Sequence, residues 1–184
     1  TSDLTPVRAQ LELVTMLASA ARRVGVIYNA GEVNSVVQVN LAKAAAADLG
    51  LEVVEATAAN SSEVLSAAQS LVGRVDALYV PTDNTVVSAI ESVVLVAERA
   101  RLPLIAGEDL SVEQGALATV GIDYYQLGRQ TADMALRVLQ GENPAEMSIE
   151  YQNEINLVVN LSAAQRMGVT IPEDLLANAA RVID

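Results

Sequence analysis

The 184-residue chain contains no cysteine and no histidine, and these two absences remove several kinds of chemistry. A Ser-His-Asp or Cys-His nucleophile cannot be built, and the common zinc sites lose their usual ligands. A magnesium or calcium site made of carboxylates alone stays open. The lack of cysteine does not identify a compartment, because an oxidising space permits disulfides without requiring them.

Aromatic and basic residues are scarce as well. The only aromatics are five Tyr, so Val, Leu, Ile and Ala must build the core. Eleven basic residues against 23 acidic ones give a net charge of -12, which disfavours binding to nucleic acid or to an anionic membrane. No apolar run approaches the roughly 20 residues of a membrane span. Residues 1–6 are polar, so we expect no signal peptide in this chain.

Short apolar runs and helical patterns alternate over the first 120 residues. The apolar runs predict strands at Arg23–Tyr28, 51–56, Ala77–Val80, 102–106 and 116–120. The segments between them have lengths typical of right-handed parallel crossovers. We therefore predict one α/β domain with a doubly wound parallel sheet.

The predicted helices have recognisable starts and buried faces. Asn34 or Ser35 can cap the helix after the first strand, whose predicted buried stripe comprises Val37, Leu41, Ala44, Ala45 and Leu49. The next predicted strand–helix junction lies at 80–87, where the polar residues 82–84 follow a buried strand and Val86 begins a helical stripe. Beyond residue 120 the pattern predicts a helix over Tyr124–Leu139, a strand over 155–159, a helix over Leu161–Met167 and a final helical turn after Pro172.

Three polar loops end predicted strands on the same edge of the sheet, at 29–35, 82–85 and 107–111. Each precedes a predicted helix start, where unpaired backbone N–H groups favour an anion. The carboxylates of Asp83, Glu108 and Asp109 favour a cation. Helix capping explains each loop taken alone, but their coincidence on one edge indicates a site for a zwitterion such as an amino acid.

Other sites at this edge are less well supported. Gly31 is the only glycine in the first strand–helix loop, so neither phosphate-binding glycine motif is present. A phosphoacceptor pocket would need an acidic pair after the first strand, where Tyr28 and Asn29 stand. An enzyme that uses carboxylates alone would depend on Glu108 and Asp109, the one acidic pair at a strand end. We expect a binding protein and not an enzyme, with no cofactor and no metal.

Four segments resemble the substrate-binding proteins of bacterial ABC transporters, in the subfamily linked to tryptophan, tyrosine and related amino acids. They are 24–29 (VGVIYN), 34–38 (NSVVQ), 79–87 (YVPTDNTVV) and 115–128 (GALATVGIDYYQLG). The resemblance implies the type I periplasmic-binding fold, in which two α/β lobes hold the ligand between them. It also implies an amino-acid ligand, a cognate permease, and a periplasmic or lipid-anchored extracellular location for the full-length parent.

Carried over residue by residue, the resemblance implies two groups of ligand-binding residues. The first, which would meet the ligand carboxylate, comprises Asn34, Ser35 and Val36. The second, which would meet the ammonium or the far side of the ligand, comprises Asp83 and Asn84, with Glu108 and Asp109 as further candidates. Thr85, next to Asn84, is also expected to bind the ligand. The effector-binding lobe of a transcription regulator has the same architecture and is the alternative, although this acidic chain lacks a DNA-binding segment.

The chain departs from the family in length. It resembles one lobe, spanning 1–184, without the N-terminal lobe that family members carry. The helical segment 121–146 is expected to pack on that other lobe, so its apolar stripe should be exposed in this chain. An exposed apolar patch of this kind favours self-association, and we expect a homodimer through the 124–140 helix.

Overall fold

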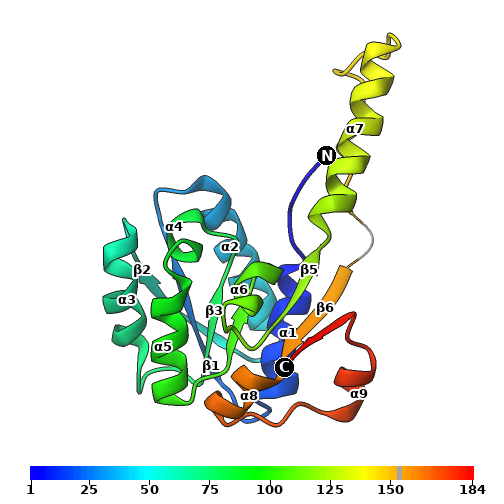
Figure 1. Ribbon diagram of the computed structural model, residues 1–184. Coiled ribbons are helices and arrows are strands. Elements are labelled where there is room, and N and C mark those ends of the chain that lie inside the picture. The colour runs from blue at the N-terminus through cyan, green and yellow to red at the C-terminus, as the bar shows by residue number, and fades with distance from the viewer. Residues whose placement is uncertain (153–154) are drawn as a thin grey trace.

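A mixed, mostly parallel seven-stranded sheet organises the computed structural model, which describes residues 1–152 and 155–184. Helices cover both of its faces (Figure 1). The elements follow in the order α1 (Val7–Leu17), β1 (Arg23–Tyr28), α2 (Val33–Asp48), β2 (Glu52–Thr57), η1 (Ser61–Glu63), α3 (Val64–Leu71), β3 (Ala77–Val80), α4 (Asn84–Val87), α5 (Ile90–Ala100), β4 (Leu104–Ala106), α6 (Asp109–Glu113), β5 (Ala118–Ile122), α7 (Tyr124–Leu139), β6 (Ile155–Asn160), α8 (Leu161–Met167), α9 (Glu173–Ala177) and β7 (Arg181–Ile183).

The strand order is β2-β1-β3-β4-β5-β6-β7. The first five strands are parallel to their neighbours, which confirms the predicted α/β sheet. β6 pairs antiparallel with β5, from Ala118 opposite Val159 to Ile122 opposite Ile155. This strand lies beyond the first 120 residues, for which the sequence predicted parallel crossovers, and the chain leaves the carboxyl edge at Ile122 and returns to that edge at Ile155. β6 must therefore run in the opposite direction, and β7 runs parallel to it.

Two layers of helices bury the sheet. α1 packs against α2 on one face, and α5 packs between α3 and α8 on the other (Figure 1). The core consists almost entirely of Val, Leu, Ile and Ala, as the composition requires. Two fully buried exceptions, Tyr79 and Gln10, are hydrogen-bonded to each other and are described with the site below.

Most predicted elements are present, with boundaries shifted by one or two residues. The helix after β3 is divided into α4 and α5 because Ala89, at φ -128°, leaves the helical conformation. Its predicted inward positions are nevertheless buried, namely Val86, Ile90, Val93, Val94 and Ala97. β7 was not predicted, since three residues carry too little periodicity to identify a strand.

The predicted buried stripe of α2 was wrong. Val37 and Leu41 face outward with 47% and 42% of their surfaces exposed, and Ala45 is the one predicted position that is fully buried. The inward side consists of Ser35, Gln38, Val39, Ala42, Ala45 and Ala46. Gln38 points inward because it hydrogen-bonds to Thr5 and Thr82, and hydrophobic periodicity does not register such contacts.

α7 projects away from the sheet as an arm, with the chain's N-terminal segment beside its base (Figure 1). None of its residues is buried, as predicted for its apolar stripe. The segment leaves the sheet at Asp123, because Gly121 and Ile122 still pair with β6. Within residues 1–152 and 155–184, no helix combines the length and the apolar character needed to cross a membrane.

Candidate functional site

The loops after β1, β3 and β4 meet at the carboxyl edge of the sheet, as the sequence predicts, because these three strands are neighbours. The backbone N–H of Asn29 donates to the Asp83 carboxylate at 2.6 Å. The Asn34 side-chain amide donates to the Thr82 carbonyl at 2.9 Å. A side chain on Gly107 would bring its Cβ within 2.8 Å of the Thr82 backbone nitrogen, so the second and third loops pack too closely for any other residue. The edge is therefore one connected structure.

Glu32, which the sequence analysis did not single out, ties the first loop to the start of α4. Its carboxylate accepts the backbone N–H groups of Asn84 and Thr85, both at 3.0 Å, and also their side chains. Burial raises the pKa of Glu32, but these four hydrogen bonds outweigh burial and hold that pKa below its usual value. The charged Glu32 carboxylate therefore serves to hold the first loop against the start of α4.

Asp83 is also used within the protein. Only 1% of its surface is exposed, and it is the N-cap of α4, accepting the Val86 N–H at 2.8 Å. Its other oxygen accepts the N–H of Asn29. Both carboxylate oxygens are thus bonded to backbone donors, as the capping interpretation of this loop predicts.

Glu108 plays the same part at α6. Its carboxylate accepts the N–H groups of Leu110 and Ser111, at 2.6 and 2.9 Å, and the Ser111 hydroxyl. Glu32 and Asp83 fill the N-terminus of α4, and Glu108 fills that of α6. The carboxylates of the chain itself therefore neutralise two of the three helix starts at this edge.

α2 is different, because its start has no side-chain cap. Glu32 occupies the N-cap position without capping the helix through its side chain. Among the described residues, the backbone N–H groups of Val33, Asn34 and Ser35 have no acceptor, whereas the N–H of Val36 donates to the Glu32 carbonyl. The predicted cap by Asn34 or Ser35 was wrong, because α2 begins before both residues. This helix start keeps free donors for an anion.

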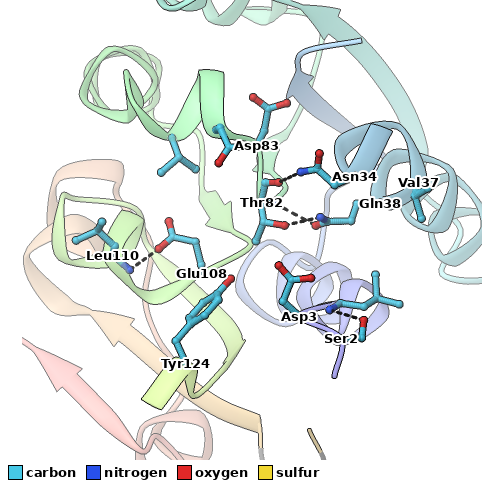
Figure 2. Close-up of a pocket in the computed structure, with 13 residues that line it drawn as sticks. Ser2, Asp3, Asn34, Val37, Gln38, Thr82, Asp83, Glu108, Leu110 and Tyr124 are labelled. Carbon is cyan, nitrogen blue, oxygen red and sulfur yellow. Dashed lines mark hydrogen bonds between the residues drawn. The ribbon is translucent and has the colours of Figure 1, made fainter. Parts of the chain in front are cut away.

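A groove of about 730 Å³ opens over this edge. Figure 2 shows the residues that line it, which come from the N-terminal segment, α2, the loops after β3 and β4, the helices α4 and α6, and the start of α7. They are Ser2, Asp3, Leu4, Asn34, Val37, Gln38, Thr82, Asp83, Asn84, Val87, Glu108, Leu110 and Tyr124. The groove combines carboxylate, amide and hydroxyl groups with several exposed apolar side chains, as a small amphiphilic ligand requires.

Four of the eight predicted site residues line the groove, namely Asn34, Asp83, Asn84 and Glu108. The other four lie beside it. Ser35 is fully buried on the inward side of α2, and Val36 is half-buried against the core. The Thr85 hydroxyl is bonded to Glu32 and Asn29. Asp109 lies in an adjoining cavity, 3.9 Å from the Arg181 guanidinium.

Gln38 is a site residue that the sequence analysis missed. Its Oε1 accepts the backbone N–H of Thr82 at 3.1 Å and the Thr5 hydroxyl at 3.5 Å, and its amide donates to the Thr82 hydroxyl. Gln38 therefore joins the N-terminal segment and α2 to the second loop. A glutamine at a helix position that faces the core is a weak sequence signal for a buried polar contact. The sequence analysis missed this signal because it assigned the wrong face of α2 to the core.

A buried polar contact supports the groove from below. The Tyr79 hydroxyl donates to Gln10 Oε1 at 2.7 Å, and the Gln10 amide donates to the carbonyls of Gly107 and Val120, at 3.2 and 2.9 Å. Burial raises the pKa of Tyr79, so its hydroxyl stays protonated and remains a donor. α1 is thereby fixed to the ends of the strands that lead to Glu108 and Tyr124.

Asp109, at the same edge, has a shifted pKa. Burial raises the pKa of Asp109, assisted by the charges of Glu108, Glu113 and Asp123, while Arg181 lowers it. Within residues 1–152 and 155–184, no group of three or more acidic side chains is arranged to hold a metal ion. The acidic side chains at this edge are spread over helix starts and do not converge.

The whole chain matches a protein family. A sequence profile of the family described as ABC transporter substrate binding protein matches residues 1–183. Among curated proteins, the "Tyrosine-binding protein" of Clostridioides difficile (strain R20291) is 43% identical over 160 residues, covering 87% of this chain and 46% of that protein. The chain spans about half the length of the curated relatives it matches.

Two solved structures share the fold closely. A conserved domain protein from Vibrio cholerae superposes with a TM-score of 0.92 at 41% identity, covering 98% of this chain and 61% of that one. An ABC domain from Streptococcus pneumonia, solved in complex with L-Trp, gives a TM-score of 0.90 at 35% identity, covering 97% of this chain and 60% of that one. In both cases nearly all of this chain corresponds to somewhat more than half of the longer protein.

Proposed function

The chain belongs to the ABC transporter substrate-binding protein family, and from this premise we propose that it forms the ligand-binding lobe of an amino-acid receptor. The family is a class of binding proteins and not of enzymes. The observation that carries the proposal is the groove at the carboxyl edge, where three loops meet and one helix start is left without a cap. Parallel α/β folds bind their ligands at this edge.

The ligand carboxylate binds at the start of α2 in this proposal. The free N–H groups of Val33, Asn34 and Ser35 and the positive end of the helix dipole favour an anion there. The starts of α4 and α6 are unsuited, since the carboxylates of Asp83 and Glu108 already fill them. Of the three residues predicted to bind the carboxylate, Asn34 and Ser35 would bind it through their backbone N–H groups. The N–H of Val36 already donates to the Glu32 carbonyl.

The ligand is an aromatic amino acid in this proposal. One relative at 43% identity is named a tyrosine-binding protein, and a structural relative at 35% identity holds L-Trp. The apolar side of the groove supplies surface for an aromatic side chain, with contributions from Leu4, Val37, Val87, Leu110 and Tyr124. The Tyr124 ring offers a stacking partner of the kind aromatic ligands prefer.

Calorimetric titration of the full-length protein that contains this chain tests the proposal. We expect heat from L-tyrosine or L-tryptophan, and an affinity for tyramine lower by about ten- to a hundredfold. Tyramine lacks the carboxylate, and charge-assisted hydrogen bonds contribute about 1.5–3 kcal/mol. L-Leucine serves as the control for the aromatic ring. Equal affinity for tyrosine and tyramine would contradict the placement of the carboxylate, and no heat from any amino acid would contradict the function.

The remaining parts of the proposal concern the full-length protein. Substrate-binding proteins of ABC transporters are typically periplasmic or extracellular, and we propose that this one delivers its ligand to a cognate permease, with a lipid anchor as one means of retention. We also propose that the segment 121–146 packs on a second lobe supplied by the part of the family's length that this chain does not span. In the isolated chain, a second copy then covers α7.

A further inference from the structure

Three carboxylates line the groove, and they differ in what they bind. Both oxygens of Asp83 accept backbone N–H groups, and so do both oxygens of Glu108. Asp3 makes no hydrogen bond and no ion pair with any of the described residues, although its side chain lines the same groove. Asp3 is therefore the one lining carboxylate whose hydrogen-bonding capacity is still free for a ligand.

The backbone around Asp3 is held in place on both sides. On one side, the Ser2 N–H donates to the Glu150 carbonyl at 2.9 Å. On the other, Thr5 is buried and its hydroxyl donates to Gln38, while the Leu4 N–H donates to the Ser2 hydroxyl at 3.2 Å. Figure 2 shows the Asp3 carboxylate facing the space between Thr82, Glu108 and the Tyr124 hydroxyl. The backbone that carries the Asp3 carboxylate is thus held in place by hydrogen bonds on both sides.

No cationic side chain of residues 1–152 or 155–184 lines the groove to pair with Asp3. None of its lining residues is Lys or Arg, and the other charged side chains that line it are Asp83 and Glu108. Burial raises the pKa of the Tyr124 phenol, and the charges of Asp3, Glu108 and Asp109 raise it further, so the negative charge of Asp3 is felt inside the groove. A ligand that brings a cation to this point gains a charge attraction that no residue lining the groove already satisfies.

We propose that Asp3 receives the ammonium group of the ligand and thereby selects α-amino acids over the α-hydroxy acids that carry the same side chain. This inference rests on the proposed function and adds a specificity residue to it. The carboxylate at the start of α2 and the ammonium at Asp3 place the α-carbon across the groove, between α2 and the N-terminal segment. A hydroxyl in place of the ammonium leaves Asp3 with a neutral donor and loses the charge attraction.

The test compares two ligands and two variants of the full-length protein. L-Tyrosine and 3-(4-hydroxyphenyl)lactate differ only in the group that meets Asp3. We expect wild-type protein to bind L-tyrosine at least tenfold more tightly than the hydroxy acid. Asp3→Asn should lower the affinity for L-tyrosine by at least tenfold and leave the affinity for the hydroxy acid within threefold. Its thermal midpoint should equal that of the wild type, because the Asp3 side chain makes no hydrogen bond and no ion pair with the described residues.

Asp174→Asn is the matched control, since it removes the same charge from an exposed position on α9 outside the groove. It should bind both ligands as the wild type does. If Asp3→Asn binds L-tyrosine with wild-type affinity, or weakens both ligands equally, the role of Asp3 is overturned while the proposed function stands. If the wild-type protein binds neither ligand and no other amino acid, the proposed function fails and the role of Asp3 fails with it.

Discussion

Asp83→Ala is expected to destabilise the protein by about 2–4 kcal/mol, because the carboxylate connects two loops inside the protein. Loss of the α4 cap accounts for about 1 kcal/mol. The Asn29 N–H also loses its acceptor, and a hydrogen bond to a charged group contributes about 1.5–3 kcal/mol. For a chain of this size the thermal midpoint should fall by roughly 5–10 °C. Thermal and urea unfolding followed by circular dichroism measure both quantities.

Asp123→Ala is the matched control for that substitution. Asp123 is also an N-cap carboxylate that accepts two N–H groups, but both belong to the next three residues of its own helix. Its loss should therefore cost about 1 kcal/mol, as an ordinary cap does. An Asp83→Ala protein that is as stable as the wild type but does not bind ligand would contradict the structural role and assign Asp83 to the ligand.

The isolated 184-residue chain should self-associate through α7. No residue of this helix is buried, and Leu136 and Leu139 expose 52% and 84% of their surfaces. Exposed apolar residues continue on the returning segment at Ile149 and Tyr151. An arm that exposes this many apolar side chains usually has a partner. Sedimentation velocity across a hundredfold range of concentration should show a concentration-dependent shift from monomer to dimer.

Replacing Leu136 and Leu139 together by Glu should abolish that shift. Burying a leucine contributes about 1.5–3 kcal/mol, so the pair should weaken association by at least a hundredfold. Leu95→Glu is the control, because Leu95 is also exposed, at 40%, but lies on α5. A wild-type chain that remains monomeric at every concentration would contradict the proposal that a second copy covers α7.

The sequence predicts the sheet and the edge that carries the groove. Continuous apolar runs identify parallel strands, and turn-forming residues after β1, β3 and β4 identify the loops that meet. Four predicted residues line the groove, including Asn34 and Glu108. These predictions succeed because the alternation of strands with helices and the turn-forming residues between them are local properties. Residues close together in the sequence determine both.

The parts that the sequence does not predict depend on long-range contacts. The inward face of α2 follows from the bonds of Gln38 to Thr5 and Thr82, which lie 33 and 44 residues away. The role of Asp3 depends on which other carboxylates are already bonded, and only the folded structure reveals that Asp83 and Glu108 are. The direction of β6 depends on where the arm returns to the sheet.

The most direct measurement is a crystal structure of the full-length protein grown with L-tyrosine. We predict that the ligand lies in the groove over the carboxyl edge, with a carboxylate oxygen about 2.7–3.2 Å from the backbone nitrogen of Asn34 or Ser35. Tyrosine bound away from this groove, or bound there with its carboxylate turned from the start of α2, would contradict the account.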